Sequence, residues 1–202
     1  MKKVKKGTCG YVRYEKKKRA LVTLVLFLIP VVIYVSGYLY TGTTSNILTV
    51  VAIVGCLPAC KSMVGLIMML MQRPMKAELY EQAKKAQGDL VGGYELIVTA
   101  YEHTSPVNAL IVCGNQIVCY VPDEKTDPAY LEKHMEKILY ANQFTSVQVK
   151  VMKDFRQYLQ RVSTIRTKQD HYRENIEWKA DERYPELSRE EVIYHTLLAI
   201  SL

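Results

Sequence analysis

The chain of 202 residues carries 27 Lys and Arg against 20 Asp and Glu, a formal net charge of +7. Nine of these cations and a single acid lie in residues 1–19, whereas residues 72–202 carry more acids than bases. The positive charge therefore belongs to a tail and does not indicate a nucleic-acid-binding surface, so we expect no nucleic-acid partner.

Two long apolar stretches follow this basic tail. Residues 20–40 contain no charged side chain, residues 47–71 contain one, and six residues separate the stretches. Because a helix rises about 1.5 Å per residue, about 20 residues cross the roughly 30 Å of a bilayer core. A cleaved signal peptide has a shorter apolar core and is not followed directly by a second one. We therefore expect residues 20–72 to form a transmembrane helical hairpin.

The flanking charges predict the orientation of this hairpin. Lys and Arg next to a span stay in the cytoplasm, and the uncharged connection 41–46 crosses the membrane at low cost. Both termini are expected at the cytoplasmic side of the cell (inner) membrane, with residues 1–19 as a cytoplasmic tail. Cations near a bilayer are attracted to anionic headgroups. The expected anionic-lipid contacts are Lys2, Lys3, Lys5, Lys6, Lys16, Lys17, Lys18 and Arg19.

Prolines and small residues predict how the two helices pack. Pro30 and Pro58 lie at matching depths and favour a kink in each helix near the bilayer midplane. Small side chains spaced by three and four residues let a second helix approach closely. In the second stretch these residues are Ala52, Gly55, Cys56, Ala59 and Cys60.

Lys61 is the one charged residue inside the second apolar stretch. An ionisable group in lipid is costly, so it is a candidate contact for a protein partner, a second copy of the chain or an ion path. If the span ends near residue 66, however, the long side chain reaches the headgroups along the helix surface. We favour this second interpretation, because two helices alone do not enclose a pore.

Residues 74–166 have the composition of a soluble α/β domain, and residues 167–202 form a charged segment with a C-terminal helix. A helix is predicted over 76–88, and strands over 94–101, 107–113 and 116–121, with a loop at 103–106. Gly114-Asn115 fits a two-residue hairpin turn, which pairs Cys113 with Gln116. Both faces of this hairpin are apolar, so it should be central in a sheet covered by helices on both sides. Cys113 and Cys119 then face opposite sides and form no disulfide.

The remaining elements complete the order αβββαβα with a mixed sheet. Asp127 and Pro128 predict the start of a helix that runs to about residue 142, and residues 146–152 alternate as in a half-covered strand. A helix with an apolar stripe follows from residue 155. Ser188 and Glu191 form a capping-box pattern ahead of the last helix.

The element order and the stretch 107–123, VNALIVCGNQIVCYVPD, resemble the core of restriction-endonuclease-like and nuclease-related domains. In that family an acid opens the second strand, and a Glu-x-Lys pattern ends the third. This sequence has Asn108, Val121 and Asp123 at the corresponding places. The resemblance therefore implies a module of that fold without its catalysis.

An alternative alignment with the Glu-x-Lys pattern of that family leaves an enzymatic function open. Asp123 and Lys125 form an Asp-x-Lys pattern that, with Glu81 or Asp89, would hold a divalent cation and a water. Pro122 argues against it, because a proline there ends the strand and leaves the pattern in a loop. The five cysteines and four histidines show no zinc-binding spacing, and we predict no metal and no cofactor.

The layout as a whole resembles uncharacterised two-span inner-membrane proteins of Gram-positive bacteria. We expect a non-catalytic, membrane-tethered binding, scaffolding or regulatory module whose partners are the lipid bilayer and a protein partner or a second copy of the chain. The alternative hypothesis is a membrane-anchored metal-dependent nuclease or other hydrolase. Besides Lys61, the expected membrane or partner contacts are Pro30, Pro58, Gly55 and Ala59.

Overall fold

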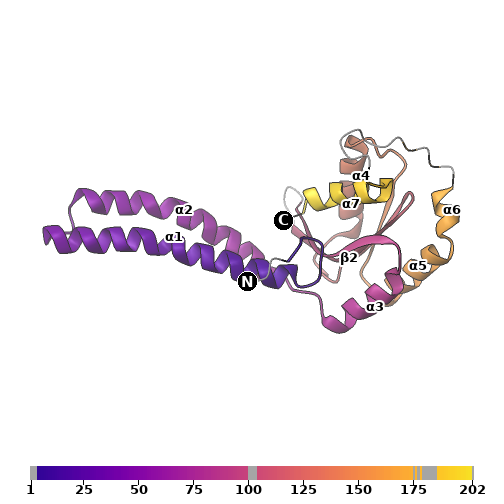
Figure 1. Cartoon of the computed structure of the whole chain (residues 1–202), viewed down its shortest axis with the longest axis horizontal. Coiled ribbons are helices and arrows are strands. Elements are labelled where there is room, and N and C mark those ends of the chain that lie inside the picture. Colours follow the sequence, from indigo (N-terminus) through magenta and orange to yellow (C-terminus); the bar gives the residue numbers. More distant parts are fainter. Residues whose placement is uncertain (1–3, 100–103, 175, 177, 179–185, 202) are drawn as a thin grey trace. The chain divides into compact units, whose positions relative to one another are not determined.

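The computed structural model describes residues 4–99, 104–174, 176, 178 and 186–201 (Figure 1). Its contacts divide the chain into two compact units. Residues 12–73 form one unit, and residues 74–202 form the other together with residues 2–11. This division differs from the expected domains in two ways: the basic tail is not a part of its own, and residues 167–202 belong to the α/β unit.

The first unit is a pair of long helices, α1 (Tyr11–Thr41) and α2 (Ile47–Met71). Both are long and apolar enough to cross a membrane. The Asn46 side chain caps α2 by accepting a hydrogen bond from the backbone N–H of Thr49 at 2.9 Å. Helix α1 begins nine residues before the apolar stretch, so part of the predicted tail is helical. Pro30 and Pro58 both lie inside the helices without ending them.

The second unit is an α/β domain with a four-stranded sheet in the order β1-β2-β3-β4. The first three strands pair antiparallel and β4 pairs parallel with β3, which confirms the predicted mixed sheet. Its elements are α3 (Ala77–Gln87), β1 (Val91–Thr99), β2 (Thr104–Cys113), β3 (Gln116–Tyr120), α4 (Pro128–Ala141), β4 (Gln148–Met152), α5 (Phe155–Thr167), α6 (Gln169–Arg173) and α7 (Arg189–Ala199).

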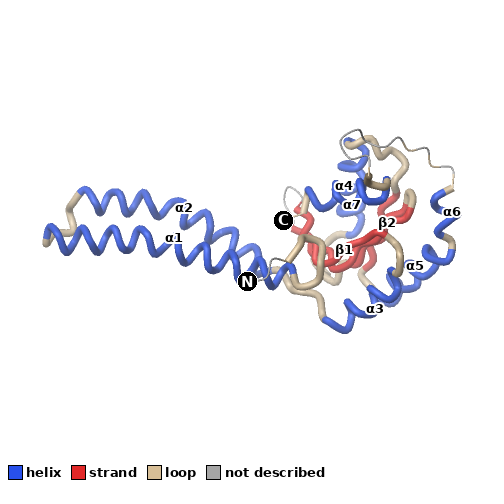
Figure 2. The backbone as a smooth tube through the Cα atoms, viewed as in Figure 1, coloured by secondary structure: helices blue, strands red, loops and turns tan. Residues whose placement is uncertain are grey.

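Helices cover both faces of the sheet, as predicted (Figure 2). Helices α4 and α7 pack on one face, and α3 and α5 pack on the other. Cys113 pairs with Gln116 across the hairpin turn, which confirms the predicted register. Cys119 consequently belongs to the core under α4 and α7, and Cys113 to the core under α3 and α5. Both are free thiols.

The predicted loop at 103–106 is corrected in part, because β2 already begins at Thr104. Thr104, Ser105 and Pro106 pair with the end of β1, whereas β3 ends opposite Ala109. Residues 104–107 therefore pair on one side only, a position where a strand tolerates proline. The predicted strand end at Tyr101 and loop start at His103 lie outside the described residues.

The start of the first strand differs from the prediction, whereas two predicted helix caps are present. β1 begins at Val91, three residues before the predicted start, because Gly92 and Gly93 extend the pairing with β2. The capping box at Ser188 and Glu191 is present, and the Asp127 side chain caps α4 as expected.

Candidate functional site

The residues of the possible metal site do not form a cluster. Asp123 lies in the turn after β3, where its carboxylate accepts hydrogen bonds from the Lys125 backbone N–H at 3.5 Å and the Thr126 hydroxyl at 3.2 Å. Glu81 lies on α3, and Asp89 lies in the turn that follows it. Among the described residues, no three His, Cys, Asp or Glu side chains group as metal ligands. The Asp123 carboxylate thus closes its own turn.

The small residues of α2 pack against α1 as a stripe. Ala52 and Ala59 are buried, and the Cα of Gly55 lies close enough to Pro30 that an added methyl group would come within 3.5 Å of its Cγ atom. Cys60 is exposed and lies outside this stripe, contrary to the pattern expected for it. The packing is therefore made by residues spaced as i, i+3 and i+7.

One hydrogen bond links the two helices within the apolar region. The hydroxyl groups of Thr23 on α1 and Ser62 on α2 lie 2.8 Å apart. Such hydroxyl pairs between membrane helices typically contribute about 0.5–1.5 kcal/mol, because a lone hydroxyl finds no water in lipid. Lys61, next to Ser62, is exposed on α2.

Two of the cations expected at lipid headgroups bind backbone carbonyl oxygens of α2 and of the residue that follows it. Lys16 Nζ donates to the carbonyl oxygens of Leu70 at 3.1 Å and Gln72 at 2.6 Å. Arg19 donates to the carbonyl oxygen of Gly65 at 3.3 Å. The carbonyl of Leu70 is among the last four of α2, which have no partner within the helix and carry the negative end of its dipole, so the Lys16 cation stabilises it.

Two cations of α1, Lys18 and Arg19, pair with one acid of the same helix. The Glu15 carboxylate is buried and accepts hydrogen bonds from Lys18 at 3.1 Å and Arg19 at 3.3 Å. Lys17 and Lys18 keep exposed side chains, as does Lys5 in the α/β unit. Lys16 and Arg19 thus bind backbone carbonyl oxygens of the protein, and Lys18, although its side chain is exposed, pairs with Glu15.

Glu95 on β1 is the most unusual acid of the α/β unit. Its residue is only 3% exposed, and its backbone has φ of 53°, a left-handed conformation that costs a residue with a side chain about 1–3 kcal/mol. One carboxylate oxygen accepts the backbone N–H of Gly10 at 3.0 Å, and the other accepts that of Met75 at 3.1 Å. Gly10 directly precedes α1, and Met75 follows α2 after a short link. One side chain thus holds the chain where it leaves the α/β unit and where it returns.

The N-terminal residues preceding Gly10 lie along the outer edge of β1. The carbonyl oxygen of Gly7 accepts the backbone N–H of Tyr94 at 2.8 Å. Lys6 Nζ donates to the carbonyl oxygen of Ser201, which itself pairs with Val98 of β1. The two chain ends therefore close this edge of the sheet together. Lys6, which the sequence assigned to lipid headgroups, has a protein partner.

A second buried acid, Glu190, binds the turn of the hairpin formed by β2 and β3. Its carboxylate accepts the backbone N–H of Gly114 at 2.7 Å and a bidentate pair of bonds from Arg173 at 2.9 and 2.8 Å. Arg189 donates to the Gly114 carbonyl oxygen at 2.8 Å and to the Asn115 side chain at 2.6 Å. Hydrogen bonding to Glu190 raises the pKa of Arg173, so the bidentate pair stabilises the charged guanidinium group.

Two further acids protect the free edge of β4. Glu136 and Glu132, one turn apart on α4, accept the backbone N–H groups of Val149 at 3.0 Å and Val151 at 2.8 Å. Unpaired N–H groups at a sheet edge otherwise attract another strand. The carboxylates therefore have a structural role at this edge.

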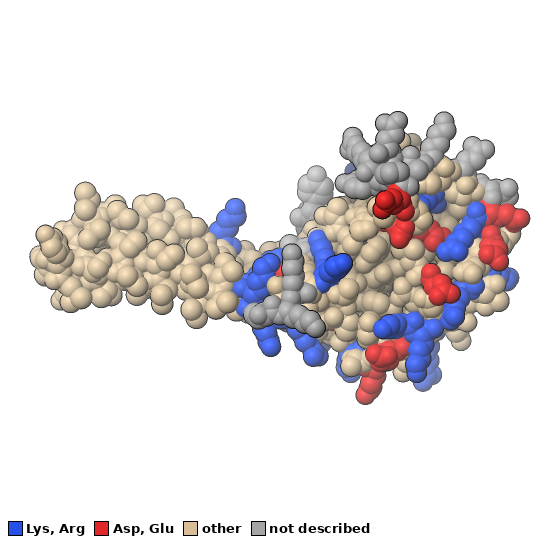
Figure 3. All heavy atoms as spheres, in the orientation of Figure 1, with Lys and Arg blue, Asp and Glu red and all other residues tan. Residues whose placement is uncertain are grey.

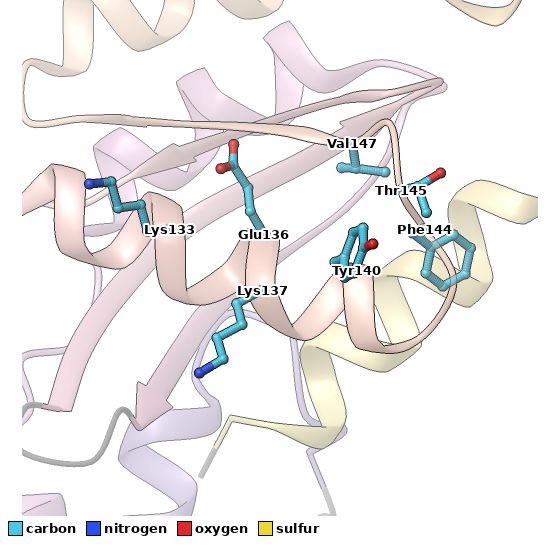
Figure 4. Close-up of a pocket in the computed structure, with 7 residues that line it drawn as sticks. All are labelled: Lys133, Glu136, Lys137, Tyr140, Phe144, Thr145 and Val147. Atoms are coloured by element: carbon cyan, nitrogen blue, oxygen red, sulfur yellow. The ribbon is translucent and has the colours of Figure 1, made fainter.

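The surface beside α4 has a shallow, open depression of about 350 Å³. In Figure 4 the side chains of Lys133 and Lys137 point in different directions and do not converge on Phe144. Its lining residues are Lys133, Glu136, Lys137, Tyr140, Phe144, Thr145 and Val147. Ligand sites usually combine an enclosed apolar wall with polar groups aimed at one point, and this depression has neither.

The candidate functional site is therefore the Glu95 region, where both links to the helix pair bind one carboxylate. No protein-family model, curated protein sequence or solved structure matches the chain.

Proposed function

We propose that this protein is a multi-pass membrane protein in which α1 and α2 cross the bilayer as a hairpin and hold a non-catalytic α/β domain at the cytoplasmic face. The observation that carries the proposal is the exposure of the apolar helix surfaces. Of the most apolar windows of α1 and α2, only 17% and 11% are buried. Such extended aliphatic surface is unfavourable in water and favourable in lipid.

The distribution of charge supports the orientation. The surface of the helix pair is almost entirely uncharged, and Lys and Arg gather at one of its ends (Figure 3). Lys16, Lys17, Lys18 and Arg19 lie at that end, and the opposite turn from residue 42 to 46 is uncharged. Cations next to a span favour the cytoplasmic side. Both termini would then face the cytoplasm, and the exposed side chain of Lys17 would lie near the anionic headgroups.

The uses of the buried carboxylates support a binding, scaffolding or regulatory role for the α/β domain. Glu95 and Glu190 both accept backbone N–H groups, and the Asp123 carboxylate closes its own turn. Carboxylates held in this way stabilise the fold. The domain would then act by binding a partner protein or a second copy of the chain.

The topology is tested by fusing a reporter that is active only outside the cytoplasm. It should be inactive after Leu202 and active when inserted at Thr43, in the turn between the helices. The matched control is a cytoplasm-active reporter at the same two positions, which should give the opposite pattern. External activity after Leu202 would overturn the orientation, and release of the protein by alkaline carbonate would overturn membrane insertion.

The absence of catalysis is tested separately on the purified full-length protein. With Mg²⁺ or Mn²⁺ and single- or double-stranded DNA, we expect no cleavage above that of a mock purification. Cleavage that disappears in Asp123→Asn would instead establish the alternative, a metal-dependent nuclease.

A further inference from the structure

Residues 4–10, here called the N-terminal strap, are fastened to the α/β unit along their length. Lys6 bonds to Ser201, Gly7 bonds to Tyr94, and Gly10 bonds to Glu95. Gly7 also fits tightly: it has φ of 82°, and an added methyl group would lie 2.1 Å from the Tyr194 phenol oxygen. The strap therefore has a defined position on β1 that only a residue without a side chain permits.

Glu95 connects this strap to the segment 72–76, which links α2 to α3. The backbone N–H groups of Gly10 and Met75 bind the two oxygens of the same carboxylate. Gly10 is covalently followed by α1, which begins at Tyr11, and Met75 is preceded by α2, which ends at Met71. A displacement of either link therefore breaks a bond to the same side chain.

The backbone of Glu95 makes this connection sensitive to such a displacement. Its left-handed φ interrupts the regular pairing of β1 with β2 between Tyr94 and Leu96. Residues held in such a conformation persist only when surrounding contacts enforce it, and they occur at switch regions. Loss of the two N–H bonds would remove contacts that enforce it here, and the neighbouring Tyr94 carries the bond to Gly7.

We propose that Glu95 and the N-terminal strap form a releasable clamp, through which displacement of either membrane helix frees the outer edge of β1. This inference rests on the proposed membrane function, since it assigns that function a regulatory element. In the closed state the two links and the strap are held together. In the open state Gly10 and Met75 lose their bonds to Glu95, and Tyr94 loses its bond to Gly7 because the strap leaves β1 as one unit.

The clamp is tested by amide hydrogen exchange of the full chain in lipid nanodiscs, at single-residue resolution. In Glu95→Gln the side chain keeps its shape, but its amide nitrogen is a donor and faces one of the two N–H groups. A hydrogen bond to a charged group is worth enough that its loss should raise exchange by about tenfold or more. We expect this increase at Gly10, Met75 and Tyr94. Tyr94 is the informative amide, because its N–H binds Gly7 and not the Glu95 side chain.

Glu190→Gln is the matched control, since it also alters a buried carboxylate of the same unit that accepts a backbone N–H. It should raise exchange at Gly114 and leave Gly10, Met75 and Tyr94 unchanged. An increase in Glu95→Gln that is confined to Gly10 or Met75, with Tyr94 unchanged, would overturn the clamp and leave two independent hydrogen bonds.

A second variant alters the strap and leaves Glu95 unchanged. It tests the same coupling if Glu95→Gln does not fold. Gly7→Ala adds the methyl group that meets the Tyr194 phenol, and coupling between sites is reciprocal. Exchange at Gly10 and Met75 should therefore rise although neither contacts residue 7. Unchanged exchange at both would refute the clamp. Failure of the chain to insert into the nanodiscs would instead refute the proposed membrane function.

Discussion

The phenol ring of Tyr194 on α7 lies directly against the Cα of Gly93 on β1. A methyl group added to Gly93 would lie 2.3 Å from the phenol oxygen and 2.7 Å from the ring carbon Cε2. We therefore expect Gly93→Ala to lower the free energy of unfolding by about 1–3 kcal/mol, because a packed interior does not absorb an added group freely. Chemical denaturation of the full chain in detergent, followed by circular dichroism, measures this change.

Changes at Tyr194 provide the control for this prediction. Tyr194→Phe removes the oxygen but leaves the ring carbons in place, so it should not rescue Gly93→Ala. Tyr194→Ala removes the ring, and the double variant should lose less stability than the two single variants added together. Strictly additive losses would show that the ring is not what limits residue 93.

Substitution by alanine should affect the stability of the helix pair differently at two of its glycines. A methyl group on Gly37 would lie 2.8 Å from Cβ of Leu48, whereas one on Gly55 would lie 3.5 Å from Cγ of Pro30. The first distance forces the helices to shift, and the second is an ordinary contact. We expect Gly37→Ala to destabilise the pair by about 1–3 kcal/mol and Gly55→Ala to change it by less than about 0.5 kcal/mol. Unfolding by SDS in mixed micelles compares them, and equal effects would contradict the packing described.

The sheet was predictable because its sequence signals are local. Gly114-Asn115 between two apolar runs determines the turn, and the turn fixes which side chains share a face. The caps at Asp127 and Ser188 are likewise short-range patterns that the structure confirms. Predictions that depended on neighbours in the sequence therefore matched the structure closely.

The Glu95 region was not predictable for the opposite reason. Its partners Gly10 and Met75 are 85 and 20 residues away in the sequence, and a lone acid in a strand usually indicates a solvent-facing position. The basic composition of residues 1–19 similarly indicates an exposed tail, although Lys6 and Lys16 bind carbonyl oxygens of the protein. The one available signal was the position of Glu95 itself, a single acid directly before the apolar run Leu96, Ile97 and Val98.

The buried thiols predict a loss of stability in alkaline solution. Burial, and next to it the charge of Glu190, raises the pKa of Cys113 from 9.0 to about 11, and burial also raises the pKa of Cys119. Between these values the unfolded chain releases the proton and the folded chain keeps it, so rising pH favours unfolding. From pH 9 to 10 each thiol should lower the free energy of unfolding by up to about 1.4 kcal/mol.

Replacement of both thiols isolates their contribution to this pH dependence. Cys113→Ala with Cys119→Ala should be less stable at pH 7, because two buried side chains are shortened, but its stability should fall less steeply between pH 9 and 10. Denaturation of both proteins at each pH gives the two slopes. Identical slopes would show that the thiols do not titrate in this range.

Lys61 distinguishes a plain membrane anchor from one that binds a partner inside or near the bilayer. The residue is exposed on α2. If it extends to the headgroups, Lys61→Leu should insert at least as well as the parent, because an apolar residue in a membrane helix is more favourable than a charged one by up to about 3–4 kcal/mol. The size of the detergent-solubilised complex and the set of co-purifying proteins should then stay the same.

A contact with an acid of another protein would give a different result for the same variant. Neither apolar stretch, 20–40 or 47–71, contains an Asp or Glu, so a carboxylate partner for Lys61 at this depth must come from another chain. Lys61→Leu would then insert normally but lose its partner or its oligomeric state, whereas Lys61→Arg, which keeps the charge and the length, would retain them. The Lys61 side chain is long enough to reach the headgroups at the C-terminal end of α2. We therefore expect Lys61→Leu and Lys61→Arg to insert equally and to keep the same partners and oligomeric state.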